Sequence, residues 1–98
     1  MSKVAAPRPR YIAFRMDGAD LGRRKVAEGL RTIAPWMHLT RWAHPHGIVR
    51  VDHEHVGQAR KMLAKGVIAG NPIETLRTSG TLKALTSALG ILADRDAV

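Results

Sequence analysis

The chain has 98 residues and no cysteine, and its 16 lysines and arginines against 8 aspartates and glutamates give a net charge of +8. The length favours one domain, the missing cysteines exclude disulfides and thiolate metal sites, and the positive charge favours nucleic acid over a membrane as the partner. Because no apolar run approaches the roughly 20 residues of a spanning helix and the N-terminus lacks the apolar stretch of a signal peptide, we expect a soluble, cytoplasmic protein.

The composition also indicates where the domain begins and ends. Residues 1–9 are expected to form a flexible basic arm, because Pro7 and Pro9 stand among small and basic residues. Residues 10–93 then form a single α/β sandwich domain, followed by a tail at 94–98. A domain of this length buries only about 60–65% of the surface of its unfolded chain, so pairing into a homodimer would add stability.

The first expected element is a half-buried strand over residues 10–16, where the residues alternate between a core set and an outer set. The core set is Ile12, Phe14 and Met16. A turn at Asp17-Gly18 leads to a helix, which we expect to begin with Asp20 as its N-cap and to end before Pro35. The apolar stripe of this helix is Val26, Leu30 and Ile33.

An antiparallel hairpin is expected next, because two strand-like runs at 37–43 and 47–52 are separated by His44-Pro45-His46. The register of this hairpin stays open. Asp52 can cap a second helix, which begins near His53 and ends near Gly66 or Gly70. The apolar stripe of that helix is Val56, Ala59 and Leu63. The cations that this stripe leaves outside are Arg60, Lys61 and Lys65.

The stretch Ile73–Leu92 combines a strand, a turn and a helix start. The strand covers residues 73–78 and is entered through Asn71-Pro72, and Ser79 offers an N-cap oxygen to the helix that follows. The stripe of this helix is Leu82, Leu85, Leu89 and Leu92. The junction suits a phosphate, because a helix N-terminus presents free N–H groups and basic and hydroxyl side chains surround this one. The alternative is an ordinary capped helix with a solvated Arg and Lys.

The order of these elements is strand, helix, strand, strand, helix, strand and a final helix. It predicts an α+β fold of the ferredoxin-like (RRM-like) βαββαβ class, with an antiparallel sheet and an additional C-terminal helix. The first two helices cover one face of the sheet in that arrangement. The final helix must therefore cover the other face or meet a partner.

The chemistry that this sheet could support is limited by its side chains. RNA-recognition motifs stack bases on aromatic residues of the central strands, and the run 47–52 has none, so contact with the backbone of folded RNA is the better hypothesis. Arg50 is the strand residue most suspected of function, because a charge in a central strand is unusual unless the face is solvated or paired. Nucleophilic catalysis by Ser79 or Thr81 is disfavoured, because no base or acid set stands around them.

Zinc binding by histidines is disfavoured. The chain holds two His-x-His pairs, but no cysteine supports a zinc site and the i, i+2 spacing splays side chains on a helix. The pairs are His44 with His46 and His53 with His55. We expect them to be polar turn and helix-cap residues, and we expect the protein to bind no metal of its own.

Three segments together resemble the ribonuclease P protein component 2 family, the archaeal relatives of the eukaryotic Pop-five and Rpp-fourteen subunits. The segments are RYIAF at 10–14, GIVRVDHEHVGQAR at 47–60 and LRTSGTLKAL at 76–85. Their order and spacing carry the resemblance, which covers most of residues 10–85. It implies a non-catalytic, RNA-binding subunit of a ribonucleoprotein that acts in tRNA processing. The active site of that ribonucleoprotein is RNA with Mg²⁺, and the protein itself holds no cofactor.

The resemblance also implies partners and site residues. The chain would support the catalytic RNA in removing the 5′ leader of precursor tRNA, which the protein meets only indirectly. Its direct partners would be ribonuclease P RNA and the TIM-barrel protein subunit, component 3. Whether the matching residues contact RNA or shape the loop that faces it stays open at this point. These residues are Arg50, His53, Arg60, Arg77, Ser79, Gly80, Thr81 and Lys83.

Two functions of other classes are the alternatives. An enzyme of the acylphosphatase type needs a Gly-x-Val-Gln-Gly-Val phosphate loop after the first strand, but residues 17–20 read Asp-Gly-Ala-Asp, and two carboxylates repel a phosphate. A protein-interaction module would use the leucine stripe of the last helix to dimerise without RNA. The salt dependence of binding distinguishes an RNA-binding protein from a dimerisation module. Phosphate contacts make RNA binding strongly salt-dependent, whereas a dimerisation module shows almost no such dependence.

Overall fold

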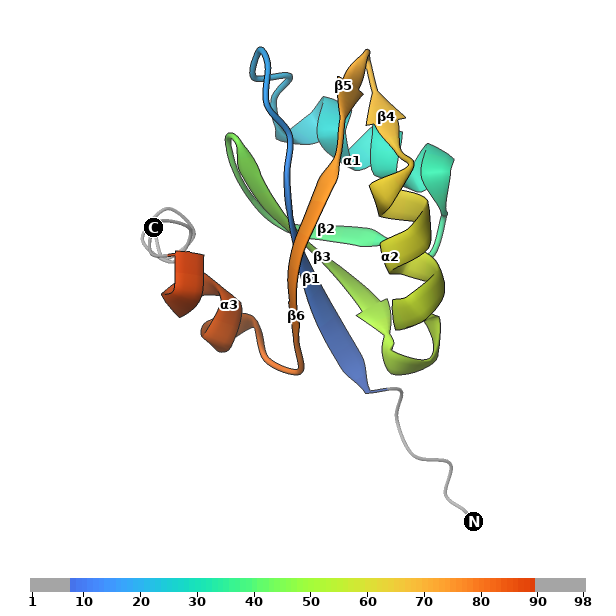
Figure 1. Cartoon of the computed structure of the whole chain (residues 1–98), viewed down its shortest axis with the longest axis vertical. Coiled ribbons are helices and arrows are strands. Elements are labelled where there is room, and N and C mark those ends of the chain that lie inside the picture. Colours follow the sequence, from blue (N-terminus) through green and yellow to red (C-terminus); the bar gives the residue numbers. More distant parts are fainter. Residues whose placement is uncertain (1–7, 90–98) are drawn as a thin grey trace.

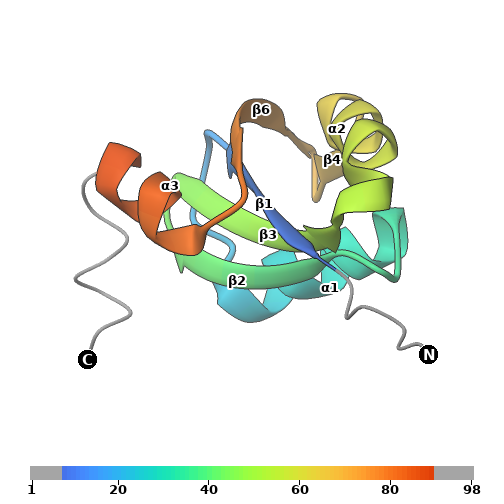
Figure 2. The ribbon, with the colours of Figure 1, turned by 90° about the horizontal axis from the view of Figure 1, so that it is seen from below.

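The computed structural model describes residues 8–89. This part of the chain has an α+β fold with a four-stranded antiparallel sheet in the order β2-β3-β1-β6 (Figure 1). Two helices cover one face of the sheet and a third packs on the other (Figure 2). The arrangement is compatible with the ferredoxin-like class that the sequence predicts.

Each predicted strand and helix has a counterpart in the structure, and a small hairpin of β4 and β5 is additional. The four strands of the sheet are β1 (Pro9–Arg15), β2 (His38–Ala43), β3 (His46–Asp52) and β6 (Glu74–Ser79). The small hairpin consists of β4 (Val67–Ile68) and β5 (Asn71–Pro72). The helices are α1 (Arg23–Ile33), the single 3₁₀ turn η1 (His53–His55), α2 (Val56–Ala64) and α3 (Leu82–Leu89).

β1 lies in the middle of the sheet, so its alternating side chains determine both packing layers. Ile12, Phe14 and Met16 are at most 2% exposed and face α1 and α2, as predicted. They meet the helix residues that the apolar stripes predict, which are Val26, Leu30, Ala59 and Leu63. Pro9, expected in the flexible arm, instead begins β1 and stands opposite Asp52 of β3.

The other face of the sheet has a smaller apolar cluster that seats α3. Leu85 is 1% exposed and packs with Ala13 of β1 and Ile48 of β3. Tyr11, Leu76 and Leu82 are partly buried around them. The sequence left two possibilities for the final helix, the second face of the sheet or a partner. In the structure α3 packs on the second face of the sheet. The side chain of Leu89 and the whole of Leu92 lie outside the described residues.

The helix caps differ from the predictions. Gly22, with φ 87°, is the N-cap of α1, and Asp20 instead accepts a hydrogen bond from the Gly22 N–H at 2.9 Å, which lowers the pKa of this carboxyl. Asp52 does precede a helical turn, but its side chain makes no cap hydrogen bond, and the turn η1 comes before α2. The Asp20 carboxylate thus makes a turn of the Asx type two residues before α1 in place of an N-cap.

The sheet has two edge strands, β2 and β6, and each contains an irregularity. β2 has an extra residue at Thr40, whose carbonyl oxygen accepts hydrogen bonds from Arg23 of α1 at 3.3 Å and from Arg41 at 3.0 Å. The register of β6 against β1 shifts around Leu76, whose carbonyl oxygen accepts from Arg60 of α2 at 3.5 Å. No helix within residues 8–89 has the length and apolar character needed to cross a bilayer.

Candidate nucleic-acid interface

The turn from β6 to α3 contains a run of the predicted site residues. Ser79 is the last residue of β6, and its Oγ accepts the Thr81 N–H at 3.2 Å. Thr81, not Ser79, caps α3, because its Oγ1 accepts the Ala84 N–H at 3.3 Å. The prediction that Ser79 is the N-cap is therefore wrong by two residues. Both oxygens are used as acceptors within the turn, so the turn is held in one shape and each hydroxyl proton can still be donated outward.

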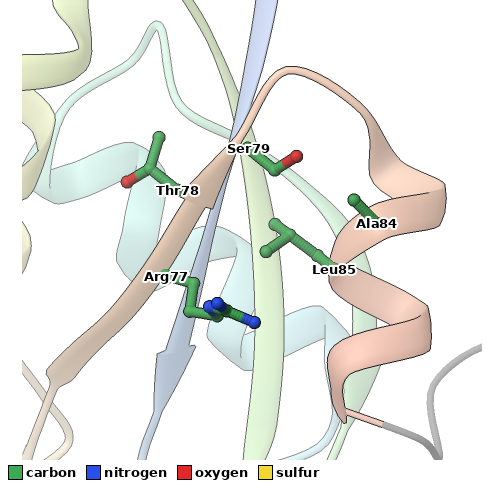
Figure 3. A pocket seen from close by; sticks show the side chains of 5 residues that line it. All are labelled: Arg77, Thr78, Ser79, Ala84 and Leu85. Atoms are coloured by element: carbon green, nitrogen blue, oxygen red, sulfur yellow. The ribbon is translucent and has the colours of Figure 1, made fainter.

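A pocket of about 210 Å³ opens between β6 and α3, lined by Arg77, Thr78, Ser79, Ala84 and Leu85. Figure 3 shows Arg77 and Ser79 on the side of β6 that faces α3, with Thr78 directed away from the helix. Leu85 closes the apolar side of the pocket. A cation and a hydroxyl donor beside an apolar wall suit an anionic group with an attached carbon skeleton, such as a sugar phosphate.

A row of side chains crosses the same sheet face and connects this turn to Arg50. Tyr11 stands opposite Arg50 on β3 and opposite Ser79 on β6. Neighbouring strands lie about 4.8 Å apart, so the backbones at Arg50 and Ser79 are about 10 Å apart across Tyr11. Arg50 and Arg77 are exposed, and neither forms an ion pair with another residue of the described part. Both guanidinium groups are thus available to phosphates.

Arg10 also belongs to this cluster, although it was not among the predicted site residues. A Cβ atom added to Gly80 would lie 3.4 Å from Nη1 of Arg10, so the arginine side chain passes directly beside the turn. Arg10 Nη1 donates a hydrogen bond to the Pro9 carbonyl at 3.1 Å. The signal that could have identified Arg10 is the strand order, because the start of β1 lies beside the end of β6.

Lys83 and His53 border the cluster, whereas Arg60 lies outside it. Lys83 is exposed in the first turn of α3, and His53 is exposed directly after β3, where its N–H donates to the Arg8 carbonyl at 2.9 Å. Arg60 reaches β6 from α2 on the other sheet face, donating to Thr78 Oγ1 at 2.6 Å. The sequence places Arg60 on the outside of its helix, but the structure has it half-buried in a contact that fastens α2 to the sheet.

No family model and no curated protein matches this chain.

The four histidines considered for zinc are kept apart by β3. His44 and His46 lie at the start of this strand, and His53 and His55 follow its end. An extended strand of this length separates the two pairs by about 20 Å. Over residues 8–89 no three metal-ligating side chains gather into a possible cation site. His55 instead stacks on Trp36, with ring centroids 4.6 Å apart, and burial together with the nearby Arg15 lowers the pKa of His46.

Proposed function

We propose that this protein is a non-catalytic RNA-binding subunit of ribonuclease P, with the β6–α3 turn and Arg50 as its contact with the RNA backbone. The observation that carries the proposal is the cluster itself. Arg50 and Arg77, each without an ion-pair partner in the described part, stand on one sheet face beside a rigid turn of hydroxyl residues, Arg77 on β6 just before the turn and Arg50 across Tyr11 from it. Such an arrangement neutralises phosphate charge and holds a phosphate in one position.

The positions of the three segments that resemble component 2 support this reading. The segments are far apart in the sequence, but they fall on β1, on β3 with η1 and α2, and on β6 with α3. β3, β1 and β6 are neighbours in the sheet. The strand parts of the three segments thus lie side by side in the sheet, whereas α2, with Arg60, packs on the face opposite α3. The strand order and directions also agree with the ferredoxin-like fold that we propose for the chain.

In this role the protein acts on the RNA and not on the scissile bond. The arginines reduce the repulsion between phosphates where RNA helices crowd together, and the turn sets the register of one backbone segment. The RNA supplies the active site with its Mg²⁺, and the TIM-barrel subunit, component 3, is the proposed protein partner. The rival dimerisation module is less well supported, because Leu85 of its leucine stripe is already buried against the sheet.

The decisive experiment is cleavage of precursor tRNA by the cognate ribonuclease P RNA at limiting Mg²⁺. The RNA is assayed alone, with the TIM-barrel subunit, and with the TIM-barrel subunit plus this chain. Faster cleavage that requires this chain is the expected result. An unchanged rate, with the protein partner shown to be bound, would refute the proposed function.

A variant pair then locates the contact. Arg77→Gln is expected to weaken RNA binding and to flatten the log–log dependence of affinity on salt by about 0.7 to 0.9 units. Arg15→Gln is the matched control, because Arg15 is also an exposed strand arginine but lies at the other end of β1 in an ion pair with Asp17. If the two variants changed the salt dependence equally, the turn would not be the RNA contact.

A further inference from the structure

The outer surface of α1 and α2 forms a second basic region, distinct from the β6–α3 turn. We call it the helical basic surface, and it consists of the exposed residues Arg24, Lys25, Arg31, Lys61 and Lys65. Both helices pack on the sheet face that Ile12 and Phe14 line, whereas Arg50 and Tyr11 are on the face of α3. α1 and α2 lie on one side of the sheet and α3 on the other (Figure 2), so the two basic regions belong to opposite sides of the sheet.

The charge of the helical basic surface is poorly compensated. Glu28 is the one acidic residue in the sequence of α1, and it pairs with Arg24 at 3.5 Å, while α2 has no acidic residue. Lys25, Lys61 and Lys65 form no ion pair with other residues of the described part of the chain. An ordinary solvated helix face mixes charges of both signs, so this surface differs from a merely solvated one.

The helix dipole favours Arg31 and Lys61, which lie in the last turns of α1 and α2, but it does not explain the cations at the start of α1. The first turn of α1 contains Arg23, Arg24 and Lys25 and no acidic residue, although the positive end of the helix dipole disfavours cations there. Lys61 of α2 and Lys65, the C-cap residue of this helix, are both exposed and four residues apart, a spacing at which like charges repel. Charge that is unfavourable in the free protein becomes favourable when an anionic partner covers it.

The character of the surface identifies the kind of partner. Among the described residues, the exposed large apolar side chain is that of Val67, which is 57% exposed. Val67 belongs to β4 and to neither helix. A protein interface usually has aromatic or aliphatic anchors at its centre, and a membrane-surface helix has an apolar face to insert. A surface that offers cations without such anchors fits a phosphate backbone best.

We propose that the helical basic surface binds the phosphate backbone of a second RNA segment, so that one chain bridges two RNA helices. This inference rests on the proposed function, because it takes both ligands to be RNA. The sheet separates the two surfaces, so each RNA segment meets its own set of cations. The protein would then hold two parts of a folded RNA at a fixed distance, in addition to neutralising charge.

The test is the number of short RNA hairpins that the full chain binds at low salt, measured by isothermal titration calorimetry. Two triple variants with equal loss of charge are compared with the wild type. The helical variant is Lys25→Gln, Lys61→Gln and Lys65→Gln. The turn variant is Arg50→Gln, Arg77→Gln and Lys83→Gln. We expect two hairpins per wild-type chain and one per chain of either variant, and each variant should flatten the salt dependence by about 2 to 3 log–log units. Far-ultraviolet circular dichroism confirms that both variants are folded.

The outcomes distinguish this inference from the proposed function. If the wild type binds one hairpin, or if the helical variant still binds two, the helical basic surface is not an RNA site. The proposed contact at the turn is unaffected in that case, provided that the turn variant loses its hairpin. If the turn variant keeps both hairpins, the proposed contact fails instead. Vesicles of phosphatidylcholine with phosphatidylserine provide the remaining arm. If the wild type binds these vesicles and the helical variant does not, while both bind RNA equally, the surface is a membrane site and the inference is overturned.

Discussion

Leu85→Ala is expected to destabilise the protein by about 2 to 4 kcal/mol, because the Leu85 side chain of α3 is fully buried on the sheet. The substitution removes three carbon groups, worth about 0.8 kcal/mol each and so about 2.4 kcal/mol together. A residual cavity adds to this transfer term. The cavity contribution should be small, because the neighbours Ala43 and Leu82 lie near the rim of the cluster and can relax toward the gap.

Urea unfolding followed by circular dichroism measures this change, with Val67→Ala as the control. Val67 is 57% exposed, so its truncation should change the free energy of unfolding by less than about 0.5 kcal/mol. In a thermal scan the Leu85→Ala variant should melt at least about 10 °C below the wild type. A near-neutral effect of Leu85→Ala would refute the reasoning, because α3 would then not be seated on the sheet in solution and its leucines would be left for a partner.

Three further predictions concern stability. Arg60→Ala should lower the free energy of unfolding by about 1 to 2 kcal/mol, because it removes the hydrogen bonds between α2 and β6. The same variant should leave the salt dependence of RNA binding unchanged in titrations at several salt concentrations. Gly47→Ala should cost about 1 to 3 kcal/mol in urea unfolding, because its Cβ would overlap the Phe14 ring, whereas Gly57→Ala, with open space around it in α2, should be stabilising. Because the pKa of His46 is lowered in the folded protein, the unfolded chain binds this proton more tightly, and the free energy of unfolding should fall as the pH drops below about 6.5. Urea unfolding between pH 7.5 and 5 measures this trend, and His46→Gln should flatten it. An increase in stability toward acid pH would contradict the last prediction.

The sequence was sufficient to predict the elements and the main core. Ile12, Phe14 and Met16 alternate at the period of a strand, Val26 and Leu30 repeat at that of a helix, and all of them are buried in the structure. These patterns are reliable because burial of one face is a property of a single element and needs no knowledge of its neighbours.

The details that depend on backbone geometry or on neighbouring elements were not predictable. Ser79 and Thr81 can both cap a helix, and the choice depends on where β6 releases the chain. Arg60 was expected in solvent, but the placement of α2 over the edge of the sheet brings it to Thr78. The alignment of Arg50, Tyr11 and Ser79 requires the strand order, which residue patterns alone do not encode.

The candidate site was predicted in part. The turn residues from Arg77 to Lys83 were identified from local composition, since they are contiguous in the chain. Arg10 was missed because its closeness to Gly80 arises from the pairing of β1 with β6. Of the helical basic surface, the sequence analysis identified only Lys61 and Lys65 as cations outside the stripe of the second helix, because it assigned no role to the cations of the first helix.

The arginines at the two edge strands also affect how copies of this protein can associate. The carbonyl groups of Thr40 on β2 and Leu76 on β6 each accept hydrogen bonds from a guanidinium at the irregular point of the strand. An incoming strand would need those carbonyls and a regular register to extend the sheet. Extension of the sheet by a strand from another copy is therefore opposed at these two points of β2 and β6.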